Sequence, residues 1–552
     1  MKSPTESHHR RRGEEAIGFE ASSRFLPAFV WLAAFAVLLL LHYPLLRLPY
    51  YWDEAGYYIP AATDFFRSWR LVPQSTLLTG HTPLVIVYLA FAWRAFGFSP
   101  LVTRTAMMAL AAGTLACVYG LARRAANREA AFWSVLLLAL SPLFFAQSTL
   151  AHLDLAAGFF TLLALAALLD DCPARFAFAC TAAVLCKETA IVLLPAAGIF
   201  VWRQRRRSTG SSAGGWWIAA LVPLAALMAW AAFYHHVTGG WTGNSEYLRY
   251  NLYATLNPIR VLLTLLRRLC ETFVGGFNWV LTAGALAGIL WSRKSIPTVV
   301  RARTGMGPAA IQTSVIPAKA AIHSFFFLAA LLCVVYLLML SAVGGAVLPR
   351  YLLPIFPPLV LAAVFLIWRL PRRMARSIMA FTAGCFVWAW FLNPPYPFPF
   401  EDNLAYADFI HLHQQAARFL EDHAGNCRIL TAWPATDELM HPLLGYVVQP
   451  LNVVTLEDFT RHDFESVSAE SFDCVYLYSR HWEPQNNWLK RFPRVQRLQQ
   501  SYFEYHPQIP DDELAARYHL RLLAGFEKRG QWARIYARIK PSERSSAFLS
   551  RH

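Results

Sequence analysis

Long apolar segments separated by short polar stretches occupy most of the first 392 residues. Several of them approach the ~20 residues that an α-helix needs to cross a bilayer. The pattern therefore predicts a polytopic α-helical membrane protein with about eleven spans. The predicted spans are residues 25–46, 101–122, 131–150, 155–170, two short helices within 176–202, and then 216–234, 273–291, 324–343, 351–369 and 377–392.

The apolar segment 83–96 is too short for a full crossing, so we expect it to be re-entrant or interfacial. With this choice, the basic residues beside the other spans, such as Arg123 and Arg124, fall on one side of the membrane. The positive-inside rule makes that side cytoplasmic. The N-terminal tail, residues 1–24, is then cytoplasmic, and the loop after the first span lies outside.

Three further segments depart from a simple succession of spans. Residues 176–202 lie between two cytoplasmic ends, so we expect two short helices with a break at 186–189. Within the external loop 235–272, the sequence VLLTLLRRL (261–269) is typical of an amphipathic interfacial helix that contacts anionic lipid. Residues 292–323 have no apolar period, and we expect them to form a mobile cytoplasmic loop.

The composition changes after residue 392. Residues 393–400 form a Pro-rich linker, which is expected to be stiff and extended. Residues 401–552 show the pattern of a small α/β domain on the extracytoplasmic side, with three or four strands. The expected elements are a helix over 403–422, strands over 428–432, 446–454 and 474–479, and a tail beyond about 510 that is helical and then basic.

Composition excludes two broad classes of protein. Hydrophobic residues make up 56% of the chain, above the roughly 45–50% of soluble domains, so the chain is not an ordinary soluble globule. The net charge of +16 comes mostly from Lys and Arg beside apolar segments, a pattern of membrane topology rather than of nucleic-acid binding. The nine cysteines show no metal-binding spacing. A disulfide between Cys427 and Cys474 is one option if their compartment is oxidising.

The loop after the first span carries the main candidates for chemistry. Residues 50–58, YYWDEAGYY, hold two adjacent carboxylates, Asp53 and Glu54, among aromatic rings typical of a membrane interface. Ionisable groups at that depth are costly unless they are paired or functional. The predicted topology brings further ionisable and polar residues to the same face: His81, Arg104, His152, Asp154, Lys187, Glu188, Arg350 and Tyr351.

Each candidate also has a purely structural interpretation. The two acids of the first loop are also typical of a helix start beside an aromatic anchor, and Asp154 suits a helix N-terminus. Lys187 and Glu188 are also consistent with an internal ion pair that holds a broken helix in place. An interfacial Arg350 is able to snorkel to water, although its guanidinium also matches the geometry of a phosphate.

In chain order, the motifs WDEAGYY, HTPL, SPLFFAQSTLAHLD, CKETAIVLLP and PRYLLPIFPP occur between about residues 25 and 370. This ordered set resembles the GT-C membrane glycosyltransferases of the Rgt-type or PMT-2 group. These are bacterial relatives of the protein O-mannosyltransferases and of the lipid A aminoarabinose transferase. The resemblance makes residues 25–392 a GT-C transmembrane catalytic domain.

The resemblance implies transfer of a sugar from a polyprenyl-phosphate-linked donor to a periplasmic acceptor, with inversion, in a bacterial inner membrane. It gives Asp53 the role of activating the acceptor hydroxyl, with Glu54 in support. The leaving phosphate would be bound by Arg350, Tyr351, Lys187 and His81. The implied partners are the donor, a lipid, glycan or protein acceptor, and membrane lipids, with no nucleic acid. A divalent metal at the first-loop acids is one option.

Two other functions fit parts of the sequence. A transporter or flippase of lipid-linked sugars would also need a polar cavity and broken helices, but it typically has internal repeats, which this sequence does not show. A non-catalytic sensor with an external domain would not need polar residues that converge from several spans. The sequence therefore favours the transferase, with the flippase as the alternative.

Overall fold

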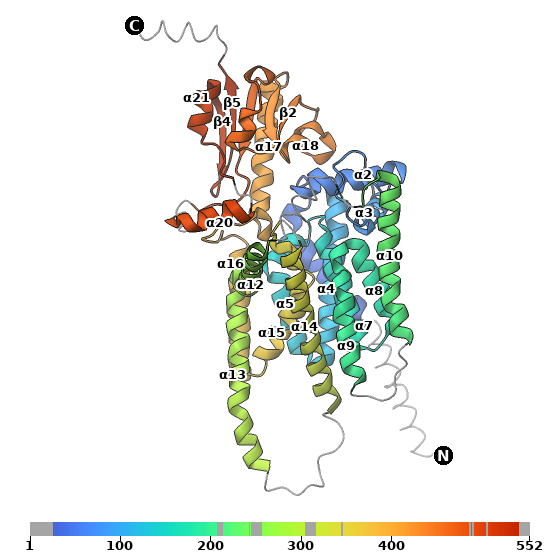
Figure 1. Cartoon of the computed structure of the whole chain (residues 1–552). Helices are drawn as coiled ribbons and strands as arrows, with labels where there is room; N and C mark the ends of the chain where they lie inside the picture. Colours follow the sequence, from blue (N-terminus) through green and yellow to red (C-terminus); the bar gives the residue numbers. More distant parts are fainter. Residues whose placement is uncertain are drawn as a thin grey trace, which may run out of the picture.

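The computed structural model describes residues 26–206, 214–241, 243, 257–303, 316–343, 346–484, 487, 491–503 and 506–539. Long helices form one layer, and a mixed sheet with its own helices lies beyond one end of that layer (Figure 1). The predicted cytoplasmic tail, residues 1–24, lies outside the described residues. The first described helix is Leu26–Leu41.

The apolar segments form helices close to the predicted positions. By length and composition, three described helices are able to cross a membrane: α4 (Pro100–Ala125), α10 (Gly214–Thr238) and the apolar part of α14 (Ile316–Ala342). The bent pair α12 (Pro258–Phe273) and α13 (Asn278–Arg303) brings the number to four if it counts as one span. Five other apolar helices have 10–17 residues, so the predicted count of about eleven spans is not confirmed. The remaining helices of this layer are α5 (Arg128–Leu140), α6 (Pro142–Gln147), α7 (Leu153–Leu169), α8 (Pro173–Cys186), α9 (Leu193–Arg205), α15 (Phe356–Ile367) and α16 (Arg372–Ala389).

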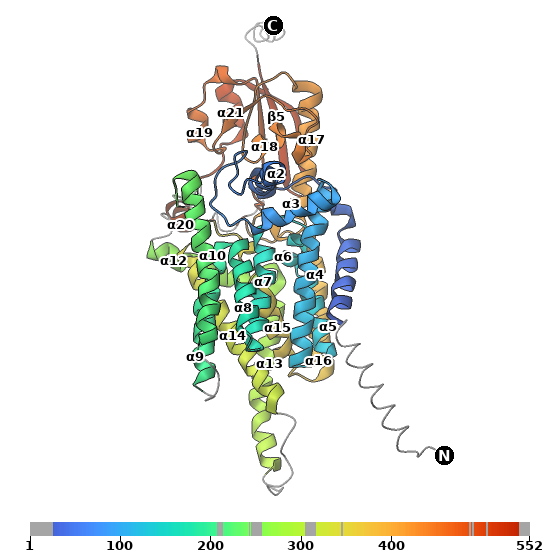
Figure 2. The same cartoon turned by 90° about the vertical axis from the view of Figure 1, so that its right-hand side faces the viewer.

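Two short helices lie across the end of the layer that faces the sheet. α2 (Ile59–Ser68) and α3 (Leu84–Phe96) lie there side by side (Figure 2). α3 has 13 residues, and at 1.5 Å per residue it is only about 20 Å long, too short for a crossing. Its length and position are those expected of an interfacial helix for this segment.

The predicted break at 186–189 is confirmed. α8 ends at Cys186, Lys187 is extended, and a 3₁₀ turn, η3 (Glu188–Val192), leads into α9. A second break was not predicted: the expected span 131–150 is divided at Ser141 into α5 and α6. Ser141 precedes Pro142 and has ψ 133°, because a residue before proline is driven out of the helical region.

The segment 292–323, which was predicted to be a loop, is partly helical. α13 continues to Arg303, and α14 begins at Ile316. The prediction followed the loss of apolar periodicity. A helix that has begun in an apolar segment can continue into a polar one, because elongation is easier than nucleation.

The C-terminal region forms a five-stranded sheet in the order β2-β1-β3-β5-β4. β1 pairs in parallel with β2 and β3, whereas β5 pairs antiparallel with β3 and β4. Two predicted strands, 428–432 and 474–479, match β1 and β3, and the third overlaps β2 only at its end. The strands are β1 (Ile429–Ala432), β2 (Val453–Leu456), β3 (Cys474–Tyr478), β4 (Leu520–Lys528) and β5 (Gln531–Arg538). The helices of ten or more residues here are α17 (Ala405–Ala424) and α20 (Pro493–Phe503), and the shorter ones are α18 (Ala435–Met440), α19 (Arg461–Glu465) and α21 (Asp511–Tyr518).

The helical tail predicted beyond residue 510 is wrong. Between residue 510 and the last described residue, Ile539, only α21 is helical, and the β4–β5 hairpin follows it. The two residues of its turn, Arg529 and Gly530, have φ values of 47° and 80°, as a type I′ hairpin requires. An Arg-Gly turn lacks the Asn or Asp that usually signals such a hairpin. Cys427 and Cys474 are both free thiols, so the disulfide option is not realised.

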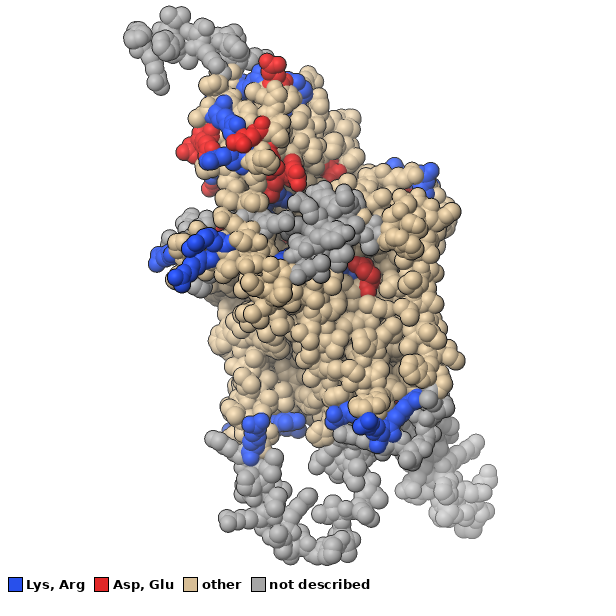
Figure 3. Space-filling view, in the orientation of Figure 1, with Lys and Arg blue, Asp and Glu red and all other residues tan. Residues whose placement is uncertain are grey.

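The sheet region packs directly on the loop after the first helix. The Tyr446 hydroxyl donates to Tyr50 O at 2.9 Å, and the Trp433 ring packs edge-on against Trp52 with centroids 5.5 Å apart. A Cβ atom at Gly56 would lie 2.2 Å from Trp433 Nε1, so this close approach requires glycine. Lys and Arg gather at the opposite rim of the helix layer, below a broad belt on which this face shows few charged side chains (Figure 3).

Candidate functional site

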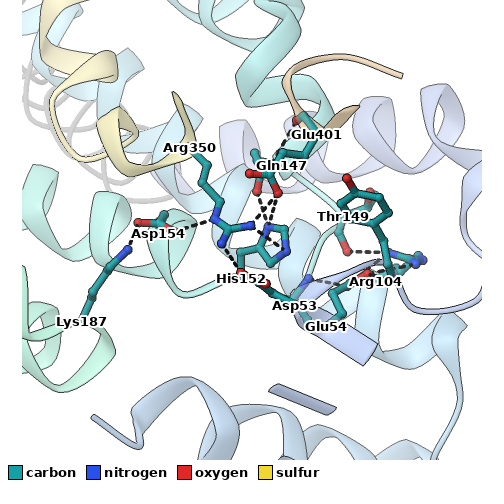
Figure 4. A network of polar contacts seen from close by, with 12 residues as sticks. Asp53, Glu54, Arg104, Gln147, Thr149, His152, Asp154, Lys187, Arg350 and Glu401 are labelled. Atoms are coloured by element: carbon teal, nitrogen blue, oxygen red, sulfur yellow. Dashed lines mark hydrogen bonds and ion pairs between the residues drawn. The ribbon is translucent and has the colours of Figure 1, made fainter. Parts of the chain in front are cut away.

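Asp53 stands at the start of a π-helical turn, η2 (Glu54–Tyr58), directly after the first helix and its connecting turn. Single π-helical turns frequently occur at functional sites. Consecutive residues of a helical turn point in different directions, so Asp53 and Glu54 diverge (Figure 4). The Asp53 side chain keeps 16% of its surface exposed, and Glu54 has none.

Glu54 and Arg104 form a closed ion pair behind Asp53. Glu54 accepts hydrogen bonds from the backbone of Ala151 at 2.6 Å and of Tyr51 at 2.8 Å. Arg104 lies 3.4 Å from Glu54 and donates to backbone oxygens, among them Pro49 O at 2.6 Å. Both side chains are fully buried.

This placement is at odds with two of the predicted roles. A catalytic Glu54 or a substrate-binding Arg104 needs accessible surface, and the structure gives them none. Their contacts instead join the first loop to α4 and to the turn before α7. We therefore treat them as residues that position Asp53.

Arg350 is the centre of a second cluster, in which one guanidinium meets three carboxylates. It forms an ion pair with Asp53, and its Nη1 lies 2.5 Å from Glu401 Oε2. Its Nε lies 3.5 Å from Asp154 Oδ2, and it is 1% exposed. Arg350 sits in a 3₁₀ turn, η6 (Pro349–Leu352), before α15. Three acids around one arginine leave a local excess of negative charge that Lys187 offsets only in part.

Lys187 comes from the break between α8 and η3 and points toward the same cluster (Figure 4). Its Nζ lies 2.6 Å from Asp154 Oδ1 and 3.7 Å from the centroid of the Tyr351 ring. Asp154 occupies the first turn of α7, where the helix dipole favours an acid. The structure thus brings together five of the predicted residues: Asp53, Asp154, Lys187, Arg350 and Tyr351.

His152 and Gln147 connect this cluster to Glu401. His152 Nδ1 lies 2.7 Å from Gln147 Oε1, and Gln147 Nε2 donates to the backbone oxygen of Glu401 at 3.2 Å. Arg350 Nη1 lies 3.4 Å from His152 Nε2, which fixes Nε2 as the acceptor and Nδ1 as the protonated nitrogen. Gln147 and Glu401 were not predicted as site residues. Glu401 follows the Pro-rich linker, and only its place just beyond the last apolar segment hinted at it.

His81 and Glu188 form a separate pair at the edge of the cluster. His81 Nδ1 lies 3.1 Å from Glu188 Oε1, and Glu188 is 36% exposed. The Tyr58 ring lies between this pair and the cluster, with its centroid 6.4 Å from the His81 ring and 6.0 Å from the His152 ring. The pair therefore borders the Arg350 cluster without joining it.

Arg268 is a further basic residue that the sequence suggested only as a lipid contact. It lies on α12, fully buried, and none of its three guanidinium nitrogens has a hydrogen-bond partner among the described residues. Its charge interacts first with the Glu271 carboxylate and then with the phenols of Tyr351 and Tyr336. The interfacial interpretation of α12 holds only for its other face, because Arg260 and Arg268 point inward. A buried guanidinium without a partner is costly unless an anion binds it.

Burial changes the acidity of the carboxylates beside the linker. Burial raises the pKa of Glu401 to about 7, against the opposing effect of Arg350. Burial, and then the charges of Glu401 and Glu271, raise the pKa of Asp402 well above its usual range. Glu401 is therefore poised to gain or lose a proton near neutral pH while it holds Arg350.

The residues present do not fit a metal site. Over the described ranges, no three His, Cys, Asp or Glu side chains are grouped in a way that could hold a metal ion. The acids that metal binding would require, Asp53 and Asp154, are already paired with Arg350 and Lys187. We therefore assign no metal ligands and derive no step through a metal.

Comparison with known proteins finds a family match over part of the chain and a shared fold. Residues 80–233 match the family described as dolichyl-phosphate-mannose-protein mannosyltransferase. Among curated proteins there is no match. ArnT from Cupriavidus metallidurans, bound to undecaprenyl phosphate, has a TM-score of 0.51 and 13% identity, over 92% of this chain and 98% of that chain.

Two other solved structures are similar at lower scores. ArnT from Cupriavidus metallidurans in the apo state has a TM-score of 0.48 and 14% identity, over 94% of this chain and 98% of that chain. The archaeal oligosaccharyltransferase AglB from Archaeoglobus fulgidus, in complex with an inhibitory peptide and a dolichol-phosphate, has a TM-score of 0.44 and 11% identity, over 94% and 75%. The family match and the fold shared with ArnT confirm the resemblance that the order of the motifs indicated.

Proposed function

We propose that this chain is a membrane glycosyltransferase of the GT-C, PMT type, and that it transfers a sugar from a polyprenyl-phosphate-linked donor to a periplasmic acceptor. The observation that supports this best is the Arg350 cluster, which holds the partly exposed Asp53 and the buried cations Arg350 and Lys187 and lies beside the buried Glu54–Arg104 pair. ArnT from Cupriavidus metallidurans, whose fold this chain shares, is bound to undecaprenyl phosphate, which supports a donor of that class.

Asp53 is the proposed general base. It is the carboxylate of the first loop that keeps accessible surface. The buried Glu54–Arg104 pair behind it fixes the direction of the loop. In the transfer, the acceptor oxygen forms a bond to the anomeric carbon while the bond to the phosphate oxygen breaks on the opposite face. The hydroxyl proton passes to Asp53, and the configuration inverts.

Lys187 and Arg268 are the proposed partners of the donor phosphate. Both are buried and cationic; Lys187 lies over the Tyr351 ring, and the charge of Arg268 interacts with the Tyr351 phenol. Arg268 offers guanidinium nitrogens that no described residue uses. Donors held in place before the reaction stabilise the charge that develops on a leaving phosphate. Arg350 stands between this phosphate site and Asp53.

The test is replacement of the base. Asp53→Asn is expected to lower transfer by at least about 1,000-fold, near the upper range for general-base catalysis, while the thermal unfolding midpoint stays unchanged. The measurement is release of polyprenyl phosphate from a radiolabelled polyprenyl-phosphate sugar in proteoliposomes supplied with a total envelope glycan extract. Asp170→Asn, which removes an exposed acid at the other end of the bundle, is the matched control.

Full transfer by Asp53→Asn would overturn the assignment of the base. Movement of labelled donor between leaflets without release of polyprenyl phosphate, unaffected by the substitution, would support a flippase instead.

A further inference from the structure

α12 presents two faces of different chemistry at the outer end of the helix layer. Arg260, Thr264 and Arg268, spaced four residues apart, point inward and are buried. Cys270 and Glu271 of the same helix line a cavity of about 310 Å³. Neither Lys187 nor Arg268, the residues proposed to bind the donor phosphate, lines this cavity, so it is a second, unassigned space beside α12.

This cavity borders the Arg350 cluster without belonging to it. Pro349, the residue before Arg350, and Asp402, the residue after Glu401, both form part of its wall. None of Asp53, Arg350 and Glu401 lines it. Its volume lies at the lower end of the ~300–1,000 Å³ typical of small-molecule sites.

Most of the cavity wall is flat and apolar. The linker supplies Tyr396 and Phe398, and proline rings surround them. Aromatic and proline faces of this kind pack well against the C–H face of a sugar ring, because both surfaces are flat and weakly polar. The remaining apolar lining residues are Pro142, Leu143, Val274, Pro349, Phe356, Pro397 and Pro399.

Three oxygen atoms at the cavity lack hydrogen-bond partners among the described residues. They are Glu271 Oε2, Asn278 Oδ1 and Asp402 Oδ1, and each atom is buried. A buried polar atom without a partner costs roughly 1–3 kcal/mol. All three can accept hydrogen bonds, so the complementary ligand is one that carries several donors on an otherwise apolar body.

The charge of the cavity is close to neutral. Glu271 is paired with Arg267 at 2.8 Å, and Arg267 also donates to Val347 O at 3.0 Å. Burial raises the pKa of Asp402, which favours its neutral carboxylic acid. A neutral acid both donates and accepts a hydrogen bond, as hydroxyl groups do. The cavity therefore suits a neutral polyol better than a cation.

We propose that this cavity is a carbohydrate subsite that holds a neutral sugar ring of the acceptor. The proposal rests on the proposed transferase function insofar as the ring belongs to the acceptor. The residues proposed for the donor phosphate, Lys187 and Arg268, do not line the cavity, and neither does the proposed base, Asp53. The acceptor would thus be glycan-bearing rather than an unglycosylated peptide or a bare lipid.

Cys270 supplies a reporter for the test, because it is exposed and lies in the cavity wall. The full-length protein is placed in phosphatidylcholine nanodiscs, and alkylation of Cys270 by N-ethylmaleimide is followed by mass spectrometry. The probe is octyl β-D-glucopyranoside below its micellar concentration. Octyl triethylene glycol ether, which has the same chain without a sugar, is the matched amphiphile. Cys172, at the opposite end of the helix layer, is the internal control.

The glucoside is expected to slow alkylation of Cys270 at least fivefold, with no change at Cys172 and no effect of the glycol ether. Asp402→Ala or Asn278→Ala should abolish this protection while the unfolding midpoint stays within a few degrees. Asp53→Asn should retain the protection. Equal protection by both amphiphiles would indicate an apolar occupant and overturn the proposal, as would no protection.

The same experiment separates this proposal from the transferase function. Protection of Cys270 does not require catalysis, so it persists even where Asp53→Asn shows no effect on transfer. Where transfer is observed, Asn278→Ala should raise the KM for the acceptor at least fivefold and leave the KM for the donor unchanged. A change in the donor KM alone would place the ring of the donor, not the acceptor, in the cavity and would overturn the assignment.

Discussion

Two buried arginines, Arg104 and Arg350, bind the two adjacent carboxylates of the first loop in opposite ways. Arg104 meets one acid, Glu54, and donates its other hydrogens to backbone carbonyls, so that charge and hydrogen bonds are balanced. Arg350 meets three acids, and Arg350 Nε, Asp154 Oδ2 and Glu401 Oε1 have no hydrogen bond among the described residues. A balanced buried pair is a structural element, whereas an unbalanced one has capacity left for a substrate.

The comparison also explains how neighbours in sequence acquire different roles. Glu54 is fixed by backbone N–H groups from Tyr51 and from Ala151, so it ties its own loop to the turn before α7. Asp53 takes no part in those bonds, and its one ion-pair partner among the described residues is Arg350. The fixed Glu54–Arg104 pair therefore sets the orientation of the accessible Asp53 side chain.

The largest expected effect on stability comes from breaking the buried Glu54–Arg104 pair. Glu54→Gln leaves the Arg104 charge buried without a counter-charge, which should lower the free energy of unfolding by about 3–5 kcal/mol. The measurement is thermal or denaturant unfolding of the purified protein. Glu129→Gln is the matched control: it breaks an exposed Glu–Arg pair with Arg376 and should cost about 0–1 kcal/mol. If Glu54→Gln keeps normal stability but loses transfer, Glu54 is a catalytic residue after all.

Arg350→Lys should show whether the Arg350 cluster needs only the positive charge or also the planar geometry of the guanidinium. Lysine keeps the positive charge, but a compact ammonium cannot reach the three carboxylates that the planar guanidinium joins. Transfer should fall about 100-fold, equivalent to about 2.7 kcal/mol, with a smaller change in unfolding than for Glu54→Gln. Arg124→Lys, at an exposed pair with Asp170, should leave transfer unchanged. If Arg350→Lys and Glu54→Gln unfold at the same temperature, the Arg350 cluster is as structural as the Glu54–Arg104 pair, and the proposed distinction between them is wrong.

Gly56→Ala tests whether the sheet region sets the position of the first loop. The new Cβ would lie 2.2 Å from Trp433 Nε1, an overlap that should cost about 2 kcal/mol, within the range for overpacking. Adding Trp433→Leu should recover most of that stability, which unfolding measurements of a double-mutant cycle would show. Equal loss in the single and double variants would mean that the clash lies elsewhere.

The smallest expected effect concerns proton uptake by Glu401. Its pKa of about 7 lies above the ordinary 4.5, so the folded state favours the protonated form. The contribution of Glu401 to stability is therefore full below pH 4.5 and is lost as the pH rises to about 7.

Glu401→Gln should remove that loss of stability. It should also lower transfer about tenfold at pH 8, or about 1.4 kcal/mol, because a neutral group leaves Arg350 more tightly bound to Asp53. Transfer by the natural protein should rise through pH 7, and the variant should lack that step. A pH–rate profile from 5.5 to 8.5 measures both, and an unchanged step in the variant would exclude Glu401 as its source.

The sequence by itself determined the class of the protein and most of the residues of the cluster. The apolar segments, the break before Lys187 and the sequence of motifs came from local patterns, because membrane burial and helix formation act over short stretches. Asp53, Asp154, Lys187, Arg350 and Tyr351 stood out because ionisable residues in apolar segments are rare.

Only the tertiary structure decided how those residues divide between support and chemistry. The sequence predicted Glu54 and Arg104 as site residues, whereas the structure shows that they are fully buried and paired with each other. Glu401 and Arg268 became visible only when distant segments met, since each is an ordinary polar residue in its own neighbourhood. The β4–β5 hairpin was missed because its turn residues are atypical and its pairing with β3 is long-range. Contacts between segments far apart in the chain leave no local pattern, and the site consists of such contacts.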